Sequence, residues 1–201
     1  MSKLPTVAII GQANVGKSSL FNRLTRSRTA IVAREAGTTR DNVVGKVSYK
    51  RRNVDSAPSD DYSQFWLIDT AGLKTAEDEF EATIQDQIAD ASAAADVILV
   101  TVDSTAYPSD TDRQLAKKAL KSGKPVILIA NKADLKGSLS IDEFKRLGIK
   151  NIIKTSAEHS IGISELLDSI AELIPPATET APDDVIRVAL IGRPNVGKSN
   201  L

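Results

Sequence analysis

The stretch TVAIIGQANVGKSSL, residues 6–20, decides the fold of this 201-residue chain. Residues 7–10 form an uninterrupted apolar run, which is typical of a strand buried on both faces of a sheet. A loop with two glycines follows, and residues 19–24 have helix-forming composition. The order strand, glycine loop, helix predicts the first unit of an α/β protein.

The loop in this stretch has the spacing Gly11-x-x-x-x-Gly16-Lys17-Ser18. Glycines at these positions let successive backbone N–H groups converge on phosphate oxygens, and the start of the helix adds a positive dipole end. Lys17 is expected to reach the β and γ phosphates, and the Ser18 hydroxyl to bind Mg²⁺. The alternative is a glycine turn without chemistry. The predicted phosphate-binding residues are Gly11, Gln12, Ala13, Asn14, Val15, Gly16, Lys17 and Ser18.

The same pattern returns near the end of the chain, where RVALIGRPNVGKSNL at 187–201 matches residues 6–20 at ten of fifteen positions. A repeat of this spacing makes a chance match untenable. The preceding segment is short, acidic and proline-bearing, which indicates a linker. We therefore predict a domain over 1–174, a linker over 175–185, and the truncated start of a second domain over 186–201. Its phosphate loop would function only in a longer chain, through Gly192, Asn195, Gly197, Lys198 and Ser199.

Apolar runs alternate with helical patterns along the first domain, which predicts a doubly wound parallel sheet. Residues 42–49 precede the next run without room for a helix, so they are expected to pair antiparallel at one edge. Residues 50–64 would be a mobile loop or an extension of these strands. The expected fold is a three-layer P-loop NTPase with a mostly parallel six-stranded sheet and one antiparallel edge strand. The other predicted strands are 7–10, 65–68, 97–102, 126–130 and 152–154, and the helices are 80–95, 111–122 and 161–174.

Composition narrows the classes of function. The chain is 41% hydrophobic and 26% charged and has no cysteine, which argues against disorder, disulfides and thiolate metal sites. No apolar run approaches the roughly 18 residues of a membrane span, so we expect a cytoplasmic chain without a membrane partner. The first 54 residues hold 11 Lys and Arg against two acidic residues, a net charge of +9. Such an arm suits a phosphate ligand, an RNA backbone or simply a solvated surface.

A second motif, Asp69-Thr70-Ala71-Gly72, follows the predicted strand 65–68. It places a carboxylate at the carboxyl edge of the sheet, beside the phosphate loop. Asp69 is expected to hold Mg²⁺ through water. Gly72 lets the backbone approach a γ-phosphate, so that its N–H senses whether the phosphate is present.

A third motif, Asn131-Lys132-Ala133-Asp134, follows the predicted strand 126–130. The Asp134 carboxylate can accept hydrogen bonds from N1–H and the exocyclic amine of guanine, a donor pair that adenine lacks. Asn131 and Lys132 would brace the loop and cover the base. A carboxylate that merely caps a helix is the alternative. After the last strand, Ser156 and Ala157 are small enough to bring backbone N–H groups to the base carbonyl, whereas His159 is expected to be a surface residue.

Residues 34–41, REAGTTRD, lie between the first helix and the edge strand. The segment is polar and contains a glycine. It is suited to a switch loop that folds over the nucleotide and supplies a threonine hydroxyl to Mg²⁺.

These segments, in this order, resemble the translation-factor-related bacterial GTPases, and NVGKSSLFNRL and GTTRD are similar to the Era-like group among them. With the second copy after an acidic linker, the chain resembles the amino-terminal GTPase domain of the double-GTPase family called Der or EngA. The resemblance covers residues 4–174 and the opening of the second domain. It implies a role in large ribosomal subunit maturation.

The resemblance also implies residue roles. Ser18 and Thr39 would ligate Mg²⁺, Asp69 to Leu73 would form the second switch, and Asn14 would hold K⁺. Three features depart from the family: Gln12-Ala13 replaces Arg-Pro, Ala71 stands where a glycine is frequent, and the 50–64 stretch is long. The nucleotide-binding residues expected beyond the phosphate loop are Asp69, Thr70, Ala71, Gly72, Leu73, Asn131, Lys132, Asp134, Ser156 and Ala157.

The parts together predict a GTPase that converts GTP to GDP and phosphate. Leu73 stands where some GTPases place a water-orienting glutamine, so intrinsic turnover should be slow, with Lys17, Thr39 and Gly72 as the catalytic candidates. Mg²⁺ and K⁺ are the expected ions. A monomer that contacts the large subunit and rRNA in the full-length protein is the expected context. The alternative is a GTP-dependent switch that binds RNA or protein with negligible hydrolysis, and an ATPase is disfavoured by the guanine motif.

Overall fold

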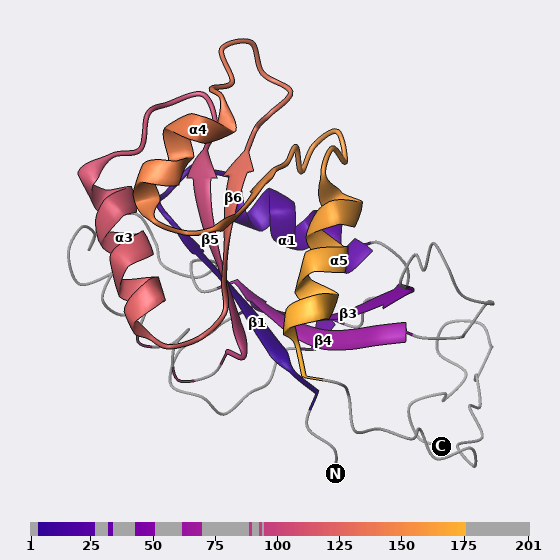
Figure 1. Ribbon diagram of the computed structural model, residues 1–201. Coiled ribbons are helices and arrows are strands. Elements are labelled where there is room, and N and C mark those ends of the chain that lie inside the picture. Colours follow the sequence, from indigo (N-terminus) through magenta and orange to yellow (C-terminus); the bar gives the residue numbers. More distant parts are fainter. Residues whose placement is uncertain are drawn as a thin grey trace, which may run out of the picture.

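A seven-stranded sheet with the order β2-β3-β4-β1-β5-β6-β7 forms the centre of the molecule (Figure 1). The structure is a computed structural model that describes residues 4–26, 32–33, 43–50, 62–69, 89, 93 and 95–175. Five strands run parallel to one another: β1 (Thr6–Gly11), β4 (Tyr62–Asp69), β5 (Val97–Asp103), β6 (Val126–Asn131) and β7 (Asn151–Lys154).

The remaining strands lie beyond β4. β3 (Val43–Lys50) pairs antiparallel with β4, and the two-residue β2 (Val32–Ala33) pairs antiparallel with β3. The mostly parallel sheet with one strand of reversed direction is confirmed, and β2 adds a short seventh strand outside it. Because β3 runs to Lys50 and β4 begins at Tyr62, strand extension accounts for both ends of the 50–64 stretch, and residues 51–61 lie outside the described residues.

Helices cover both faces of the sheet and make three layers, as Figure 1 shows. α1 (Lys17–Arg26) and α5 (Ile163–Leu173) pack on one face. α3 (Asp110–Lys121), α4 (Ile141–Phe144) and the 3₁₀ turn η1 (Lys145–Leu147) pack on the other. The α4 and η1 turns were not predicted. The helix expected over 80–95 lies outside the described residues, apart from helical positions 89 and 93 and the non-helical residue 95.

The uninterrupted apolar character of β1 follows from this layering. Val7 and Ile9 point into the core beneath α1 and α5, while Ala8 and Ile10 point into the core beneath α3, and all four side chains are fully buried. Successive residues of a strand face opposite sides, so a strand covered on both faces needs apolar residues at every position.

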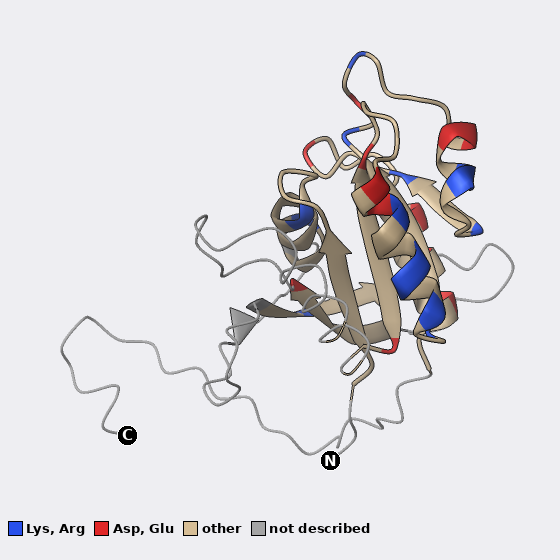
Figure 2. Cartoon of the chain, turned by 90° about the vertical axis from the view of Figure 1, so that its left-hand side faces the viewer, with Lys and Arg blue, Asp and Glu red and all other residues tan. Residues whose placement is uncertain are grey.

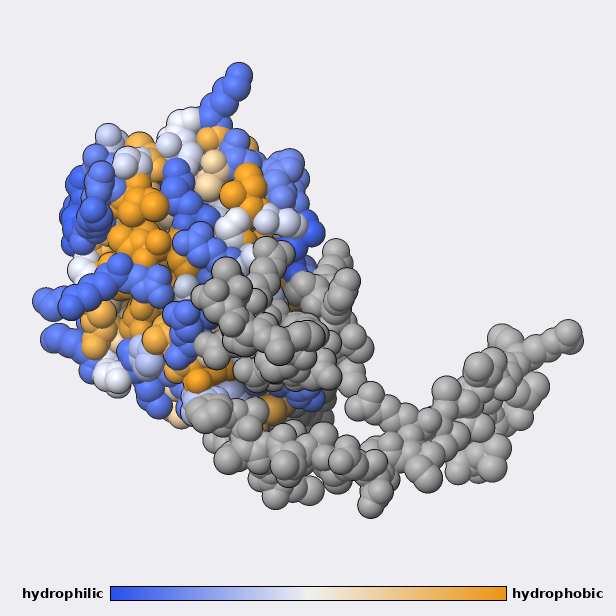
Figure 3. Space-filling view, turned by 45° about the vertical axis from the view of Figure 1, so that its right-hand side comes forward, coloured by the Kyte–Doolittle hydropathy of each residue, from blue (hydrophilic) through white to orange (hydrophobic). Residues whose placement is uncertain are grey.

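The local sequence explains where helix α3 begins and ends. Ser109 and Asp112 form a reciprocal capping box at its start, where acidic residues favour the helix dipole. Lys118 and Lys121 occupy its last turn. Figure 2 shows the Lys and Arg positions as blue segments along the ribbon of this helix. On the face drawn in Figure 3, hydrophobic residues reach the surface between hydrophilic ones.

Candidate functional site

Because β1, β4, β6 and β7 run parallel, their carboxyl ends lie at one edge of the sheet, where open α/β sheets bind ligands. The loop between β1 and α1 turns sharply, with positive φ at Gly11 (155°), Asn14 (63°) and Gly16 (93°). A Cβ at Gly11 would lie 2.4 Å from the Thr101 carbonyl oxygen, so only glycine lets the loop pass this close to β5.

Lys17 begins α1 and lies in the phosphate loop itself. Its side chain is 7% exposed, and its Nζ donates to the backbone oxygen of Gln12 at 2.6 Å. Burial lowers the pKa of Lys17, and the nearby Asp69 carboxylate opposes that shift. The ammonium group is thus held by the loop at the place where the loop would hold an anion.

Ser18 and Asp69 come together as the sequence predicted for two Mg²⁺ ligands. The Ser18 hydroxyl donates to Asp69 Oδ2 at 3.0 Å, although the two residues belong to α1 and to the end of β4. Asp69 is 2% exposed. Hydroxyl and carboxylate oxygens are hard ligands of the kind Mg²⁺ selects, so this pair fits that ion.

Asn131 ties the two halves of the site together. It is 2% exposed, and its side-chain amide donates to the Val15 backbone oxygen at 2.9 Å. Its side-chain oxygen accepts from the Thr155 hydroxyl at 3.1 Å and from the Ala157 N–H at 3.2 Å. A Cβ at Gly16 would lie 2.3 Å from this amide nitrogen, which explains the second glycine of the loop. Asn131 therefore links the loop between β1 and α1 to the segment after β7.

Lys132 is braced from a neighbouring strand. Its Nζ lies 2.6 Å from Asp103 Oδ2 at the end of β5. Burial opposes ionisation of Asp103, but hydrogen bonds from Lys132 and Thr105 outweigh it and hold the pKa of this carboxyl below its usual value. Lys132 also lines the cavity described next.

Asp134 points into a cavity of about 130 Å³ that Gly16, Ser19, Asn131, Ser156 and Ala157 also line. A hydrogen bond from the Ser156 side chain holds the pKa of Asp134 below its usual value, so the carboxylate is ionised at neutral pH. His159, expected as a surface residue, has a side chain 59% exposed, and its Nε2 lies 3.5 Å from Asp134 Oδ2. This cavity therefore presents an anionic acceptor to a ligand.

Several predicted positions lie outside the described residues: Thr39, Thr70, Ala71, Gly72, Leu73, and the second loop Gly192, Asn195, Gly197, Lys198 and Ser199. The structure adds contacts that sequence reasoning missed. Asp103 could have been found, because it ends an apolar run at the same edge of the sheet. No local signal marks the pairing of Gln12 Nε2 with Ser109 Oγ and Asp112 Oδ1, each at 2.7 Å, or of Arg23 with the loop after β7.

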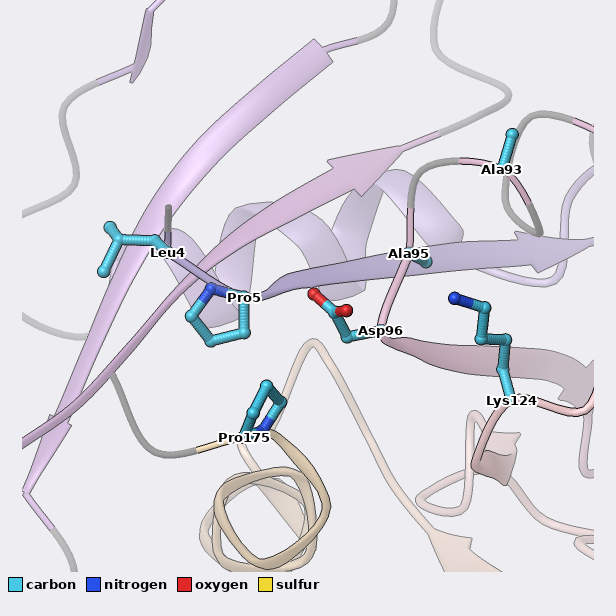
Figure 4. A pocket seen from close by; sticks show the side chains of 7 residues that line it. All are labelled: Leu4, Pro5, Ala93, Ala95, Asp96, Lys124 and Pro175. Atoms are coloured by element: carbon cyan, nitrogen blue, oxygen red, sulfur yellow. The ribbon is translucent and has the colours of Figure 1, made fainter. Parts of the chain in front are cut away.

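A second cavity, of about 260 Å³, lies at the amino ends of the strands (Figure 4). Leu4 and Pro5 enter it from the start of β1, Pro175 from the end of α5, and Asp96 from the residue before β5. Asp96 Oδ2 accepts from the Thr6 N–H at 2.8 Å, which anchors the start of β1. This cavity contains none of the groups that the sequence motifs place at the opposite edge.

Comparison with protein families places the geometry in context. The model described as "50S ribosome-binding GTPase" matches residues 6–132, which include the phosphate loop, Asp69 and Asn131. The chain belongs to this GTPase family.

Relatives agree with that assignment. The chain is 41% identical to GTPase Der of Gemmatimonas aurantiaca over 200 residues and 42% identical to GTPase Der of Myxococcus xanthus over 207 residues. Each alignment covers 98% of this chain and 43% of the relative, so the chain spans less than half the length of these proteins. The predicted likeness to the Der family is confirmed.

Solved structures give the same fold. A variant of Aquifex aeolicus Era bound to GDP and AlF₄⁻ has a TM-score of 0.65 at 27% identity, covering 94% of this chain and 63% of that one. Era in complex with MgGDPNP and nucleotides of 16S ribosomal RNA has a TM-score of 0.62 at 26% identity, covering 92% and 61%. In the part of the GTPase domain that the structure describes, no helix is long and apolar enough to cross a membrane.

Proposed function

We propose that this domain binds Mg·GTP at the carboxyl edge of its sheet and hydrolyses it slowly to GDP and phosphate. The observation that carries the proposal is the Asn131 side chain, which bonds both the phosphate loop at Val15 and the base loop at Ala157. One buried residue thereby sets the spacing between a phosphate-binding half and a guanine-binding half.

At the guanine end, the ionised Asp134 carboxylate would accept from N1–H and the 2-amino group of the base. Adenine presents no such donors, and a carboxylate held in this cavity without them would lose its solvation without compensation. Of the backbone N–H groups around Ser156 and Ala157, that of Glu158 on the cavity wall would donate to the base carbonyl, since those of Ser156 and Ala157 bond Ile161 and Asn131. One side of the cavity would therefore accept hydrogen bonds from guanine, and the other side would donate one to its carbonyl oxygen.

At the phosphate end, Lys17 would donate to the β and γ phosphates, and the N–H groups between Gly11 and Ser18 would surround the β-phosphate. Ser18 would hold Mg²⁺ directly and Asp69 through water, and Thr39 is the proposed third ligand. Bound Mg²⁺ supplies neutralisation of the charge that develops on the γ-phosphate oxygens. Lys17 adds the protein's own positive charge at the same oxygens.

We further propose that the domain acts as a switch in ribosome biogenesis, in large-subunit maturation. Thr39 and the segment from Asp69 to Leu73, with the Gly72 N–H, would respond to the γ-phosphate. The family description names 50S binding, and the Era structure contains ribosomal RNA, which supports a ribosomal partner. A monomeric, cytoplasmic protein with a linker over 175–185 and a second domain from 186 completes the proposal. A nucleotide-dependent RNA- or protein-binding switch with negligible turnover is the alternative.

The test is phosphate release from GTP and from ATP by the purified chain. We expect slow turnover of GTP alone, its loss on chelation of Mg²⁺, and its loss in Ser18→Ala. Ser122→Ala is the matched control, since that hydroxyl bonds the Ala119 backbone oxygen at the far end of α3. GTP binding without release would favour the binding-switch alternative, and equal turnover of ATP would contradict the guanine assignment.

The same assay in K⁺ and in Na⁺ at equal ionic strength tests whether Asn14 holds K⁺. This residue is exposed and has a left-handed backbone at the tip of the phosphate loop, which frees its side chain for an ion near the phosphates. We expect faster turnover in K⁺ and no difference between the salts in Asn14→Ala. Equal rates of the unmodified chain in both salts would refute a K⁺ site.

A further inference from the structure

We propose that Arg23 is a positioning residue that sets guanine selectivity by fixing the base loop from the side of α1. The proposal rests on the proposed nucleotide function of this site. Arg23 Nε donates to the Ala157 backbone oxygen and its terminal nitrogen donates to the Glu158 backbone oxygen, both at 2.6 Å. Arg23 is separated from Ala157 by 134 positions in the sequence and from Glu158 by 135, so the two contacts tie distant segments together.

The contacts fix the loop because they hold two consecutive peptide groups. In a trans peptide the N–H points opposite to the C=O, so holding the carbonyls of Ala157 and Glu158 also sets the directions of the Glu158 and His159 N–H groups. The His159 N–H in turn donates to Ser156 Oγ at 3.1 Å. The loop that faces the base carbonyl is thereby held in one conformation before a ligand arrives, which reduces the ordering cost of binding.

The residue type suits this task. Arginine presents several donors in a rigid planar fork, so one side chain can bridge two carbonyl oxygens, whereas lysine is a single flexible point charge. Within the described part of the chain, Arg23 has no carboxylate partner, and both of its bonds go to this loop. Its neighbours Leu24 and Phe21 are buried in the core, which keeps this part of α1 in place.

The helix that carries Arg23 also begins with Lys17 and Ser18. A single rigid element therefore holds the phosphate-binding residues at its first turn and the base loop further along. Asp134, on the other side of the cavity, is held from the start of this segment, because the Ser156 side chain hydrogen-bonds it and the Ala133 N–H donates to the Thr155 backbone oxygen at 2.9 Å, whereas Arg23 holds the two residues after Ser156. Loss of Arg23 should accordingly weaken recognition of the base carbonyl more than recognition by Asp134.

Three nucleotides distinguish recognition of the base carbonyl from recognition by Asp134. GDP carries the carbonyl oxygen and the 2-amino group, 6-thio-GDP replaces the carbonyl oxygen by a poorer acceptor, and IDP lacks the 2-amino group. The dissociation constants of all three would be measured by calorimetry for the unmodified chain, Arg23→Met, Arg23→Lys and Arg113→Met. The last variant is the control, because Arg113 pairs with Asp110 on the exposed face of α3.

For Arg23→Met we expect GDP to bind about tenfold more weakly, and the preference for GDP over 6-thio-GDP to fall at least about threefold. The preference for GDP over IDP should stay within about twofold, and Arg23→Lys should restore part of the lost selectivity. Arg113→Met should match the unmodified chain in every ratio.

An unchanged GDP to 6-thio-GDP ratio in both Arg23 variants would overturn the proposal, and a GDP to IDP ratio that falls equally would mean a merely structural loss and overturn it too. If Arg23→Met does not fold, Arg23→Lys alone decides, since it retains one donor and cannot bridge both carbonyls in a planar fork. Failure of the unmodified chain to bind GDP would instead overturn the proposed function.

Discussion

Lys17→Ala is expected to reduce Mg·GTP turnover by about 10³-fold, because it removes the one buried cation in the described phosphate loop. The Gln12 carbonyl that Lys17 contacts is itself an acceptor and cannot replace the charge. Initial rates of phosphate release at saturating GTP give the measurement. Lys121→Ala, at the exposed end of α3, is the matched control and should retain full turnover.

The same variant should not lose stability. Burial lowers the pKa of Lys17, which means that the folded protein holds this cation at a cost. Removing it should therefore leave the free energy of unfolding of the nucleotide-free chain equal or higher, as measured by calorimetry, with an unchanged circular dichroism spectrum. Turnover that survives in Lys17→Ala would exclude this loop from the reaction.

Asp134→Asn is expected to weaken GDP binding by about a hundredfold, because two hydrogen bonds to a charged acceptor are lost and an amide donor faces the base donors. The amide matches xanthine, whose altered edge presents an acceptor at that position, so affinity for xanthosine diphosphate should rise. Competition calorimetry with both nucleotides measures the exchange of preference.

Asp142→Asn is a suitable control for that substitution. Asp142 pairs with Lys145 on exposed α4 and η1, and its pKa is lowered by the Lys145 contact, so it shares the charge and the hydrogen-bonded state of Asp134 without facing the cavity. It should bind GDP like the unmodified chain. Undiminished GDP affinity in Asp134→Asn would rule out its role in reading the base.

Sequence patterns predicted the buried strands well because a doubly covered strand needs apolar residues at every position. They placed the start of β4 three residues late, since Tyr62, Ser63 and Gln64 are not an apolar run and are held by antiparallel pairing with β3. The four-residue α4 and the turn η1 are too short for a helical period to develop.

In the candidate site, too, some residues were predicted from the sequence and others were missed. Residues that lie within a motif, such as Lys17, Asp69 and Asp134, were predicted because the chemistry requires those types at those spacings. Residues that hold the motifs together were missed, because Arg23 and Asp103 meet their partners only through the folded topology. Motifs specify the chemistry, and long-range packing specifies how firmly each motif is held.

The central claim is that the unmodified chain has one nucleotide site and that this site selects guanine over adenine. Titration calorimetry with GDP, a non-hydrolysable GTP analogue and ADP in Mg²⁺ tests this claim most directly. The account predicts binding of both guanine nucleotides with a stoichiometry near one, and no detectable binding of ADP, because the described residues form one phosphate loop and one guanine cavity. ADP affinity equal to that of GDP, or a stoichiometry near two, would contradict it.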